Sequence, residues 1–245
     1  QGNVRAPRAG TLWFMSKLWE SDDQLFAIAH EELFTAVVGD VMDKIHLLHQ
    51  FLPAAIKPVH REMVTIGRAM PVLEADYFEE VSQTGQNPIS RKPFGLMFEA
   101  LDSLQKNEIY ICTGSSPTYA LWGELMSVRA MYCGAAGAIL DGPSRDTRGI
   151  LDLKFPTFAR GTYAQDQGAR GKVLDFRIPI EIEGVRIQPG DILFGDEDGV
   201  LVVPRAAEEE VFARAIEKAR KEKTVRKAIE GGMSARQAFD EFGIL

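Results

Sequence analysis

The chain has 245 residues, with 28 lysines and arginines against 35 aspartates and glutamates, and therefore a formal net charge of −7. This acidic balance argues against a general nucleic-acid binder, because a phosphate-binding surface is normally basic. Hydrophobic residues make up 45% of the chain and charged residues 26%, which is typical of a soluble globular protein with a sizeable core. No apolar run approaches the roughly 20 residues of a membrane span.

The cysteines and the N-terminus bear on the compartment. Cys112 and Cys133 show neither CxxC nor Cys–His spacing, so neither a disulfide framework nor a zinc site is indicated. The first residues lack the apolar core of a signal peptide. We therefore expect a cytoplasmic protein.

The N-terminal half of the sequence alternates helical and extended patterns. The first 20 residues are polar and interrupted by glycine and proline, so we expect an N-terminal arm. Apolar periodicity then predicts elements in this order: a helix from Asp22, a helix over 39–49 that Pro53 ends, a strand over 63–73, a long surface loop, and a short helix over 94–104.

The middle of the chain carries the clearest pattern. We expect, in order, a buried strand over 108–113, a helix over 123–133, a strand over 138–140, a helical turn near 147–152, a strand over 156–159 and a glycine-rich loop over 161–172.

The last third of the chain differs in composition. Short β-branched runs over 177–182, 191–194 and 200–203, separated by glycine-containing turns, predict a β-meander. A long charged helix over 206–230 and a shorter helical extension over 231–245 follow. We therefore predict an α/β fold with a mixed sheet in one domain over 21–230, with helical extensions at both ends.

A candidate site lies between Gly123 and Asp146. The first amides of the predicted helix, those of Gly123, Glu124, Leu125 and Met126, have no intrahelical partners and bind anions well. Arg145 can hold a carboxylate in a bidentate fork, and Asp146 is an oxygen ligand of the kind that Mg²⁺ or Mn²⁺ accepts. This set suits a small keto acid held beside a divalent metal ion, whose enolate the positive charges would stabilise.

These residues carry a family resemblance. Gly123 to Met126 followed by Arg145-Asp146, with Gly123 and Arg145 22 positions apart (145 minus 123), resembles the marker of one family. That family includes the 4-hydroxy-4-methyl-2-oxoglutarate/4-carboxy-4-hydroxy-2-oxoadipate aldolases and the regulator of ribonuclease activity A. Further matching stretches are LFTAVVGDVMD at 33–43, AGAILDGPSRDTRGI at 136–150, FPTFARGT at 155–162 and IEGVRIQPGDILFGDEDGVLVVP at 182–204.

The resemblance implies a swivelling β/β/α (RraA-like) architecture and a division of roles. The amides of Gly123 to Met126 and the side chain of Arg145 would hold a pyruvate unit, Asp146 would bind the metal and Glu124 would assist. By position, Asp40 and Glu222 would be acidic residues supplied by a neighbouring subunit, since members form trimers or pairs of trimers. The implied reaction is retro-aldol cleavage of a 4-hydroxy-2-oxo acid to pyruvate and a second keto acid, with oxaloacetate decarboxylation as a side activity.

Each of these residues also has a simpler interpretation. Arg145-Asp146 alone would be a surface turn with a helix N-cap; Glu124 would be a first-turn dipole partner; Asp40 would cap the second helix; and Glu222 would pair with Lys218 or Arg226. We interpret Asp196, Glu197 and Asp198 as a tight turn rather than a metal cluster, His46 and His49 as helix-surface residues, and Trp122, Met126 and Met131 as core residues.

Two rival functions remain at this stage. A non-enzymatic interaction protein, like the ribonuclease regulator, would not need Arg145, Asp146 and Glu124 together. A methyltransferase would need a glycine-rich cofactor loop directly after a strand, whereas Cys133–Gly137 precedes one. We expect a keto-acid enzyme that binds neither nucleic acid nor membrane.

Overall fold

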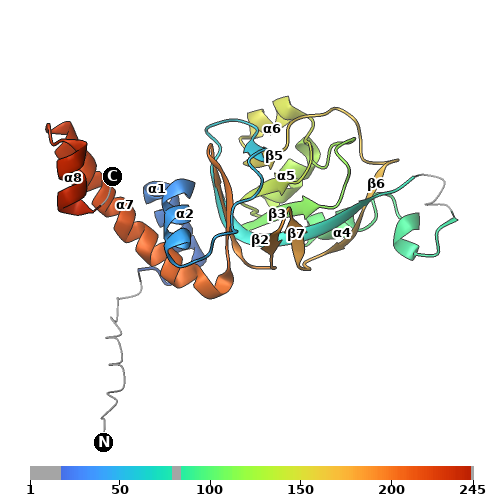
Figure 1. Ribbon diagram of the computed structural model, residues 1–245. Coiled ribbons are helices and arrows are strands. Elements are labelled where there is room, and N and C mark those ends of the chain that lie inside the picture. Colours follow the sequence, from blue (N-terminus) through green and yellow to red (C-terminus); the bar gives the residue numbers. More distant parts are fainter. Residues whose placement is uncertain (1–17, 79–83, 244–245) are drawn as a thin grey trace, which may run out of the picture.

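A mixed β-sheet forms the centre of the molecule, with helices packed on one face and at one end (Figure 1). This is a computed structural model, and it describes residues 18–78 and 84–243. Strand order is β1-β5-β4-β3-β2-β9-β10, and β6 also pairs with β2. The four neighbours β5, β4, β3 and β2 run parallel, whereas β1, β6, β9 and β10 pair antiparallel. A single mixed α/β domain with helical ends is thus confirmed.

The strands are β1 Lys57–Pro58, β2 Thr65–Asp76, β3 Glu108–Thr113, β4 Gly137–Leu140, β5 Thr157–Ala159, β6 Gly171–Phe176, β7 Ile180–Ile182, β8 Val185–Ile187, β9 Ile192–Asp196 and β10 Gly199–Val203. The helices are α1 Asp22–Glu32, α2 Thr35–Lys44, α4 Met97–Asp102, α5 Glu124–Tyr132, α6 Thr147–Leu153, α7 Glu208–Glu230 and α8 Ala235–Phe242, with short 3-10 turns η1 Pro88–Arg91 and η2 Arg205–Ala207.

Strand β3 shows how the sheet separates two parts of the core. All six of its residues are buried, as the apolar run predicts. Because side chains alternate along a strand, Tyr110 and Cys112 join the cluster that lies against α4, α5 and α6. Ile109 and Ile111 join the opposite cluster, which the β7–β8 hairpin covers. The sheet is therefore buried on both faces where the site lies.

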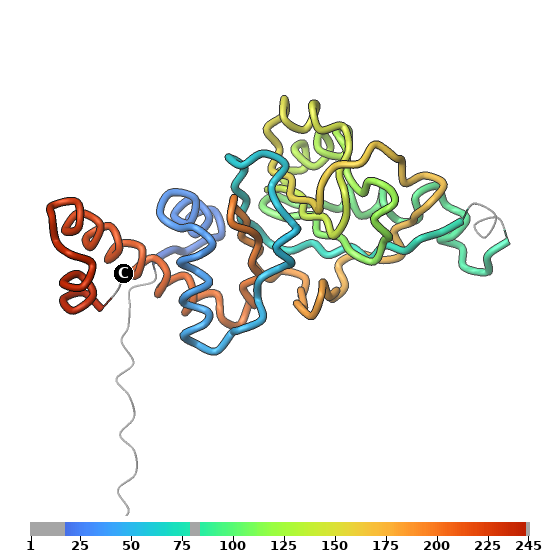
Figure 2. The backbone as a smooth tube through the Cα atoms, turned by 45° about the horizontal axis from the view of Figure 1, so that its top comes forward, coloured from blue at the N-terminus to red at the C-terminus, as the bar shows by residue number. Residues whose placement is uncertain are grey.

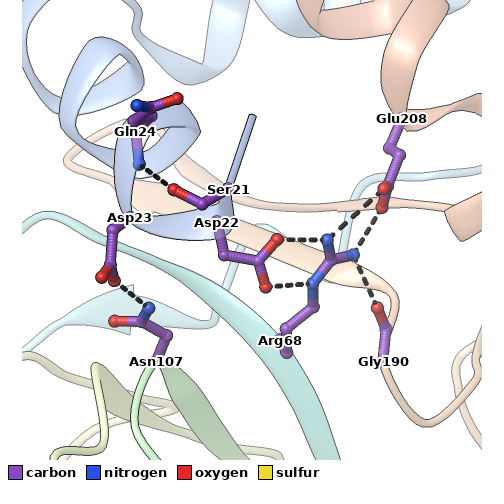
Figure 3. Close-up of polar contacts among 8 residues, drawn as sticks. All are labelled: Ser21, Asp22, Asp23, Gln24, Arg68, Asn107, Gly190 and Glu208. Atoms are coloured by element: carbon purple, nitrogen blue, oxygen red, sulfur yellow. Dashed lines mark hydrogen bonds and ion pairs between the residues drawn. The ribbon is translucent and has the colours of Figure 1, made fainter. Parts of the chain in front are cut away.

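A third apolar cluster joins the helical lobe, α1, α2 and α7, to the end of the sheet. At this junction the guanidinium of Arg68, on β2, contacts carboxylates from two helices (Figure 3). Its Nε and Nη2 donate to Asp22 at 2.8 and 2.6 Å, and Nη1 donates to Glu208 and to the carbonyl of Gly190. These two carboxylates outweigh the effect of burial and raise the pKa of Arg68. We call these four residues the junction cluster.

The C-terminal helices extend away from the sheet (Figure 2). Helix α7 begins beside α2 and continues past it, and α8 folds back against α7. The predicted long helix and shorter extension are confirmed. In the described part of the chain, no helix has both the length and the apolarity needed to cross a membrane. The predicted arm over 1–20 falls almost wholly outside the described residues.

Several predicted boundaries were wrong. Helix α2 spans Thr35–Lys44 rather than 39–49, since the amide and hydroxyl of Thr35 both donate to Asp196 at 2.7 Å and start the helix early. His46 has a positive φ of 64°, which breaks the helix well before Pro53. The early helix start depends on a residue 161 positions away in sequence, which no local pattern reveals.

The sheet also extends into predicted loops. Strand β2 continues to Asp76 because β6 pairs with its second half, and the segment before α4 contains η1 rather than only loop. The predicted meander was wrong as a unit: β6 was missed, β7 and β8 form a separate two-stranded sheet, and β9 and β10 join the main sheet. Arg177, the predicted first residue of a strand, has a φ of 58° and lies directly after the end of β6.

Candidate active site

The candidate site lies where three parallel strands end. The chain segments that follow β3, β4 and β5 continue side by side, with Ser144 bridging Trp122 on one side and Thr162 on the other. The amide of Arg145 donates to the carbonyl of Trp122 at 2.9 Å, and the amide of Tyr163 donates to that of Ser144 at 2.8 Å. The carboxyl ends of parallel strands are the usual place for ligand sites in such sheets.

The start of α5 is the element at which the sequence predicts anion binding. Gly123 is its N-cap and makes no side-chain cap. The hydroxyl of Ser127 donates to the carbonyl of Gly123 at 3.0 Å and accepts from the indole of Trp122 at 2.7 Å, which fixes the turn. A Cβ on Gly123 would lie 2.6 Å from Oδ2 of Asp146. Glycine is therefore required here for close approach of the carboxylate, since its own φ of −150° is open to any residue.

Asp146 is held in an unusual backbone conformation. Its φ of 54° and ψ of 36° are left-handed, and it is the N-cap of α6 without using its side chain as a cap. Instead Oδ2 accepts from the amide of Glu124 at 3.4 Å and lies 3.8 Å from Nε of Arg145. The simpler interpretation, in which this dipeptide provides a helix N-cap, is thus correct for the backbone of Asp146. The carboxylate, however, turns toward α5 and the guanidinium, and strained residues of this kind cluster at functional sites.

Arg145 is oriented by a residue that the sequence analysis missed. Its Nη2 lies 3.0 Å from Oδ1 of Asp166, in the loop between β5 and β6. Asp166 in turn accepts from the amide of Gly168 at 2.8 Å through its other oxygen. The Arg145 side chain is 37% exposed, so it remains accessible to a ligand. Only the polar, glycine-rich character of this loop signals a site residue there.

The remaining residues of the predicted helix start differ in environment. Glu124 is exposed, and its carboxyl group packs over Gly149 of α6, where a Cβ would collide with it. Leu125 is 81% exposed, and Met126 is partly buried against the core. Trp122 is buried as predicted, but Met131 is 44% exposed, so its assignment to the core was wrong.

Asp40 and Glu222 lie together in the helical lobe, on α2 and α7, and Figure 1 shows these helices apart from α5 and α6. Both accept a hydrogen bond from Nζ of Lys218, at 2.8 Å for Asp40. Burial opposes the charge on Lys218, but the two carboxylates outweigh it and raise its pKa. The Glu222–Lys218 pairing is confirmed. Asp40 lies inside α2, so it does not cap that helix.

The other proposed non-site residues agree in part. Asp196 accepts from the amide of Asp198 at 2.9 Å in the turn between β9 and β10, as a tight turn predicts. His46 and His49 are exposed, but they follow α2 instead of lying on it. Within residues 18–78 and 84–243, no three His, Cys, Asp or Glu side chains are grouped to hold a metal ion.

The donor set at Asp146 fits one kind of metal. Its side chain is 45% exposed beside the free end of a helix, with no cage of protein ligands among the described residues. Mg²⁺ is commonly bound in this way, through one or two carboxylates, retained waters and the substrate itself. A zinc-like site with four protein ligands does not fit.

Comparison with known proteins places this geometry in a family. The family model described as "RraA-like: Aldolase/RraA" matches residues 35–202. The chain therefore belongs to the RraA-like family, and the resemblance found in the sequence is confirmed. The matched range lies inside the domain predicted over 21–230, whose outer limits stay a prediction.

Individual relatives extend the comparison. The chain is 31% identical over 207 residues to a Halalkalibacterium halodurans protein named "Putative 4-hydroxy-4-methyl-2-oxoglutarate aldolase", covering 84% of this chain and 90% of that one. A solved structure described as one of novel cellulases from gut-associated microbes is 33% identical over 86% of this chain and 90% of its own, with a TM-score of 0.73. Streptomyces coelicolor RraAS2, described as an unusual member of the RNase ES inhibitor RraA protein family, shares the fold at 19% identity, with a TM-score of 0.70 over 85% and 98% of the two chains.

Proposed function

We propose that this protein is an aldolase that cleaves a 4-hydroxy-2-oxo acid to pyruvate and a second keto acid with the help of a divalent metal ion. The observation that carries the proposal is the convergence of Arg145, Asp146 and the first turn of α5 at one sheet edge. The name of the Halalkalibacterium halodurans relative supports the same reaction class.

Binding of the pyruvate half follows from the donors at this edge. The amides of Leu125 and Met126 belong to the first turn of α5, so they have no intrahelical partners and are free to bind an anion. Arg145 supplies a planar fork for the carboxylate and the 2-keto oxygen. Asp166 pairs with the guanidinium, so the Arg145 side chain needs little further ordering when a ligand binds.

The chemistry requires one base and one site for negative charge. A base removes the proton from the C4 hydroxyl, the C3–C4 bond breaks, and C4 becomes the carbonyl carbon of the second keto acid. The electron pair passes to the pyruvate enolate, which takes a proton at C3 to give pyruvate. Arg145 and the α5 amides face the oxygen on which this charge develops, and such preorganised donors are worth several kcal/mol in rate.

The metal ion, Mg²⁺ or Mn²⁺, would add Lewis-acid polarisation of the 2-keto group. Asp146 would hold it, largely through its waters, and Glu124, whose backbone amide donates to Asp146, would assist. Oxaloacetate decarboxylation would follow from the same stabilised enolate, because loss of its C4 carboxylate leaves the same three-carbon unit.

We further propose that copies of the chain complete the site, as a trimer or a dimer of trimers in the cytoplasm. Leu125, Val128 and Tyr132 form one stripe along α5 and are 81%, 47% and 83% exposed, directly beside the site. A neighbouring copy packed there would bring its own acidic residues, for which Asp40 and Glu222 are the proposed pair, and would provide the base.

The test is a coupled assay of pyruvate release from 4-hydroxy-4-methyl-2-oxoglutarate and from oxaloacetate, with Mg²⁺ and with a chelator. We expect Mg²⁺-dependent pyruvate from at least one substrate and no reducing sugar from carboxymethyl-cellulose. Arg236→Ala, which removes an exposed arginine that pairs with Asp240 on the same helix, serves as a matched control. A folded protein that releases no pyruvate from either substrate would favour the alternative of a non-enzymatic interaction protein.

A further inference from the structure

A buried acid on β2 lies beneath the candidate site. Glu74 is 2% exposed, and burial, with a smaller effect of nearby Asp76, raises its pKa to about 8, although the neighbouring Cys112 thiol acts in the opposite direction. One hydrogen bond reaches it from the loop between β5 and β6: Nε2 of Gln167, itself 4% exposed, donates to its Oε2 at 2.9 Å. Its Oε1 has no hydrogen-bond partner among the described residues.

Gln167 follows directly after the residue that holds Arg145. Asp166 thus lies between two fixed points: the carbonyl of Gln165 accepts from the amide of Ala120 at 2.8 Å, and Gln167 is tied to Glu74. The carbonyl of Gln167 also accepts from two amides at the start of β6. The position of the Asp166 carboxylate is therefore fixed through the contacts of both of its sequence neighbours, Gln165 and Gln167.

We propose that Glu74 and Gln167 are positioning residues for Arg145, acting through Asp166. The sequence of contacts is continuous: Glu74 to Gln167 at 2.9 Å, the peptide bond to Asp166, and Asp166 to Arg145 at 3.0 Å. This inference rests on the proposed function for the identity of the ligand, a planar keto-acid anion, but not for the contacts themselves.

A purely structural role would call for a different residue at position 74. Glu74 is buried beside the cluster that contains Tyr110 and Cys112, and burial of an acid there costs stability that an apolar side chain of similar volume, such as leucine, would not. A hydrogen-bond acceptor is needed at this place only if the Gln167 amide must be held. The contact is thus best explained by the geometry of the loop that it fixes.

The experiment measures binding of oxalate, a planar dianion with the shape of the pyruvate enolate, by calorimetry in the presence of Mg²⁺. Gln167→Leu and Glu74→Leu remove the contact and keep the volume, and each is expected to weaken oxalate binding about tenfold, the effect of losing one placed hydrogen bond. Glu74→Gln retains an acceptor for the Gln167 amide and is expected to restore binding to within about twofold of the wild type.

A double-mutant cycle separates this role from general destabilisation. Combining Gln167→Leu with Asp166→Ala should weaken binding little more than Asp166→Ala alone, because both changes act on the same contact to Arg145. Tyr119→Phe is the matched control: it removes a hydrogen bond of 2.9 Å to Asp76 on the same strand, which does not lead to Arg145. Multiplicative effects in the cycle, or a tenfold loss in Tyr119→Phe, would overturn the proposal.

Hydrogen exchange of the 165–171 amides provides a readout that does not depend on any ligand. Glu74→Leu should accelerate exchange at Gly168, whose amide donates to Asp166, whereas Glu74→Gln should not. If these amides respond as expected but the wild type neither binds oxalate nor releases pyruvate, the positioning holds and the proposed chemistry fails. If the wild type is active and the amides do not respond, the positioning is wrong.

Discussion

Two arginines in this molecule have opposite environments. Arg68, in the junction cluster, has its guanidinium shared between two carboxylates and a backbone carbonyl, and its side chain is 18% exposed. Arg145, at the sheet edge, has one close carboxylate partner at 3.0 Å and a second at 3.8 Å. A saturated guanidinium holds elements together, whereas an undersaturated one retains hydrogen bonds for a ligand.

The surroundings of the two arginines differ in the same way. Near Arg145 the chain departs from stable local chemistry: Asp146 has a φ of 54°, and the hydroxyl of Ser144 is buried without a hydrogen-bond partner among the described residues. At the junction cluster, α1 begins with an orthodox cap, Ser21, which accepts from the amide of Gln24. Local rules tend to be broken where function requires it, which supports the proposed site at this end of the sheet.

The largest expected effect is on turnover. Arg145→Ala should lower kcat/KM for pyruvate release by about 10³-fold or more, because the fork that meets the developing charge is lost. The unfolding temperature should change little, since the side chain is partly exposed and makes few contacts. If the variant keeps the wild-type kcat/KM, Arg145 is not the arginine that binds the substrate.

A second effect is on the pH dependence of stability. Because the pKa of Glu74 is raised to about 8 in the folded protein from an ordinary value of 4.5, its favourable contribution is full below 4.5 and is lost as pH rises to about 8. In that window the wild type should lose roughly 1.4 kcal/mol per pH unit relative to Glu74→Gln. Urea unfolding of both proteins at pH 5 and pH 8 measures this difference. An equal change in the free energy of unfolding of the two proteins between these pH values would contradict it.

A smaller effect is expected at the junction cluster. Arg68→Met should lower the free energy of unfolding by about 2–3 kcal/mol, less than for a fully buried pair because Asp22 is 40% exposed. Lys106→Met is the control. It removes an exposed ion pair with Asp23, which follows Asp22 on α1, and should cost less than about 1 kcal/mol. Below its melting temperature Arg68→Met should retain wild-type KM; a raised KM would mean that the junction cluster also shapes the site.

The sequence was sufficient for the part of the site that is local. The strand, helix and strand over 108–140 were predicted with nearly correct ends, because their apolar patterns and Gly123 act within a few residues. The grouping of Asp146 with the start of α5 rested on residue chemistry and on the family resemblance, and not on any periodicity. Its left-handed conformation was not predicted, since the residue type favours it only weakly.

What the sequence did not reveal depends on distant contacts. Asp166 lies in a loop whose pattern indicates only irregular structure, and its role appears once β6 pairs with β2 and carries the loop back to Arg145. Arg68 is the one charged residue in the predicted strand over 63–73, and its partners come from helices 46 and 140 positions away. No window of local sequence contains such pairings.

The most direct test of the pyruvate half-site needs no knowledge of the true substrate. In D₂O with Mg²⁺, an enzyme that stabilises the pyruvate enolate exchanges the methyl protons of pyruvate for deuterium, which proton NMR records as loss of the methyl signal. We predict exchange that is far above the rate with Mg²⁺ alone, that is retained in Arg236→Ala and that is abolished in Arg145→Ala. Exchange by the wild type no faster than by Mg²⁺ alone would contradict the proposed site.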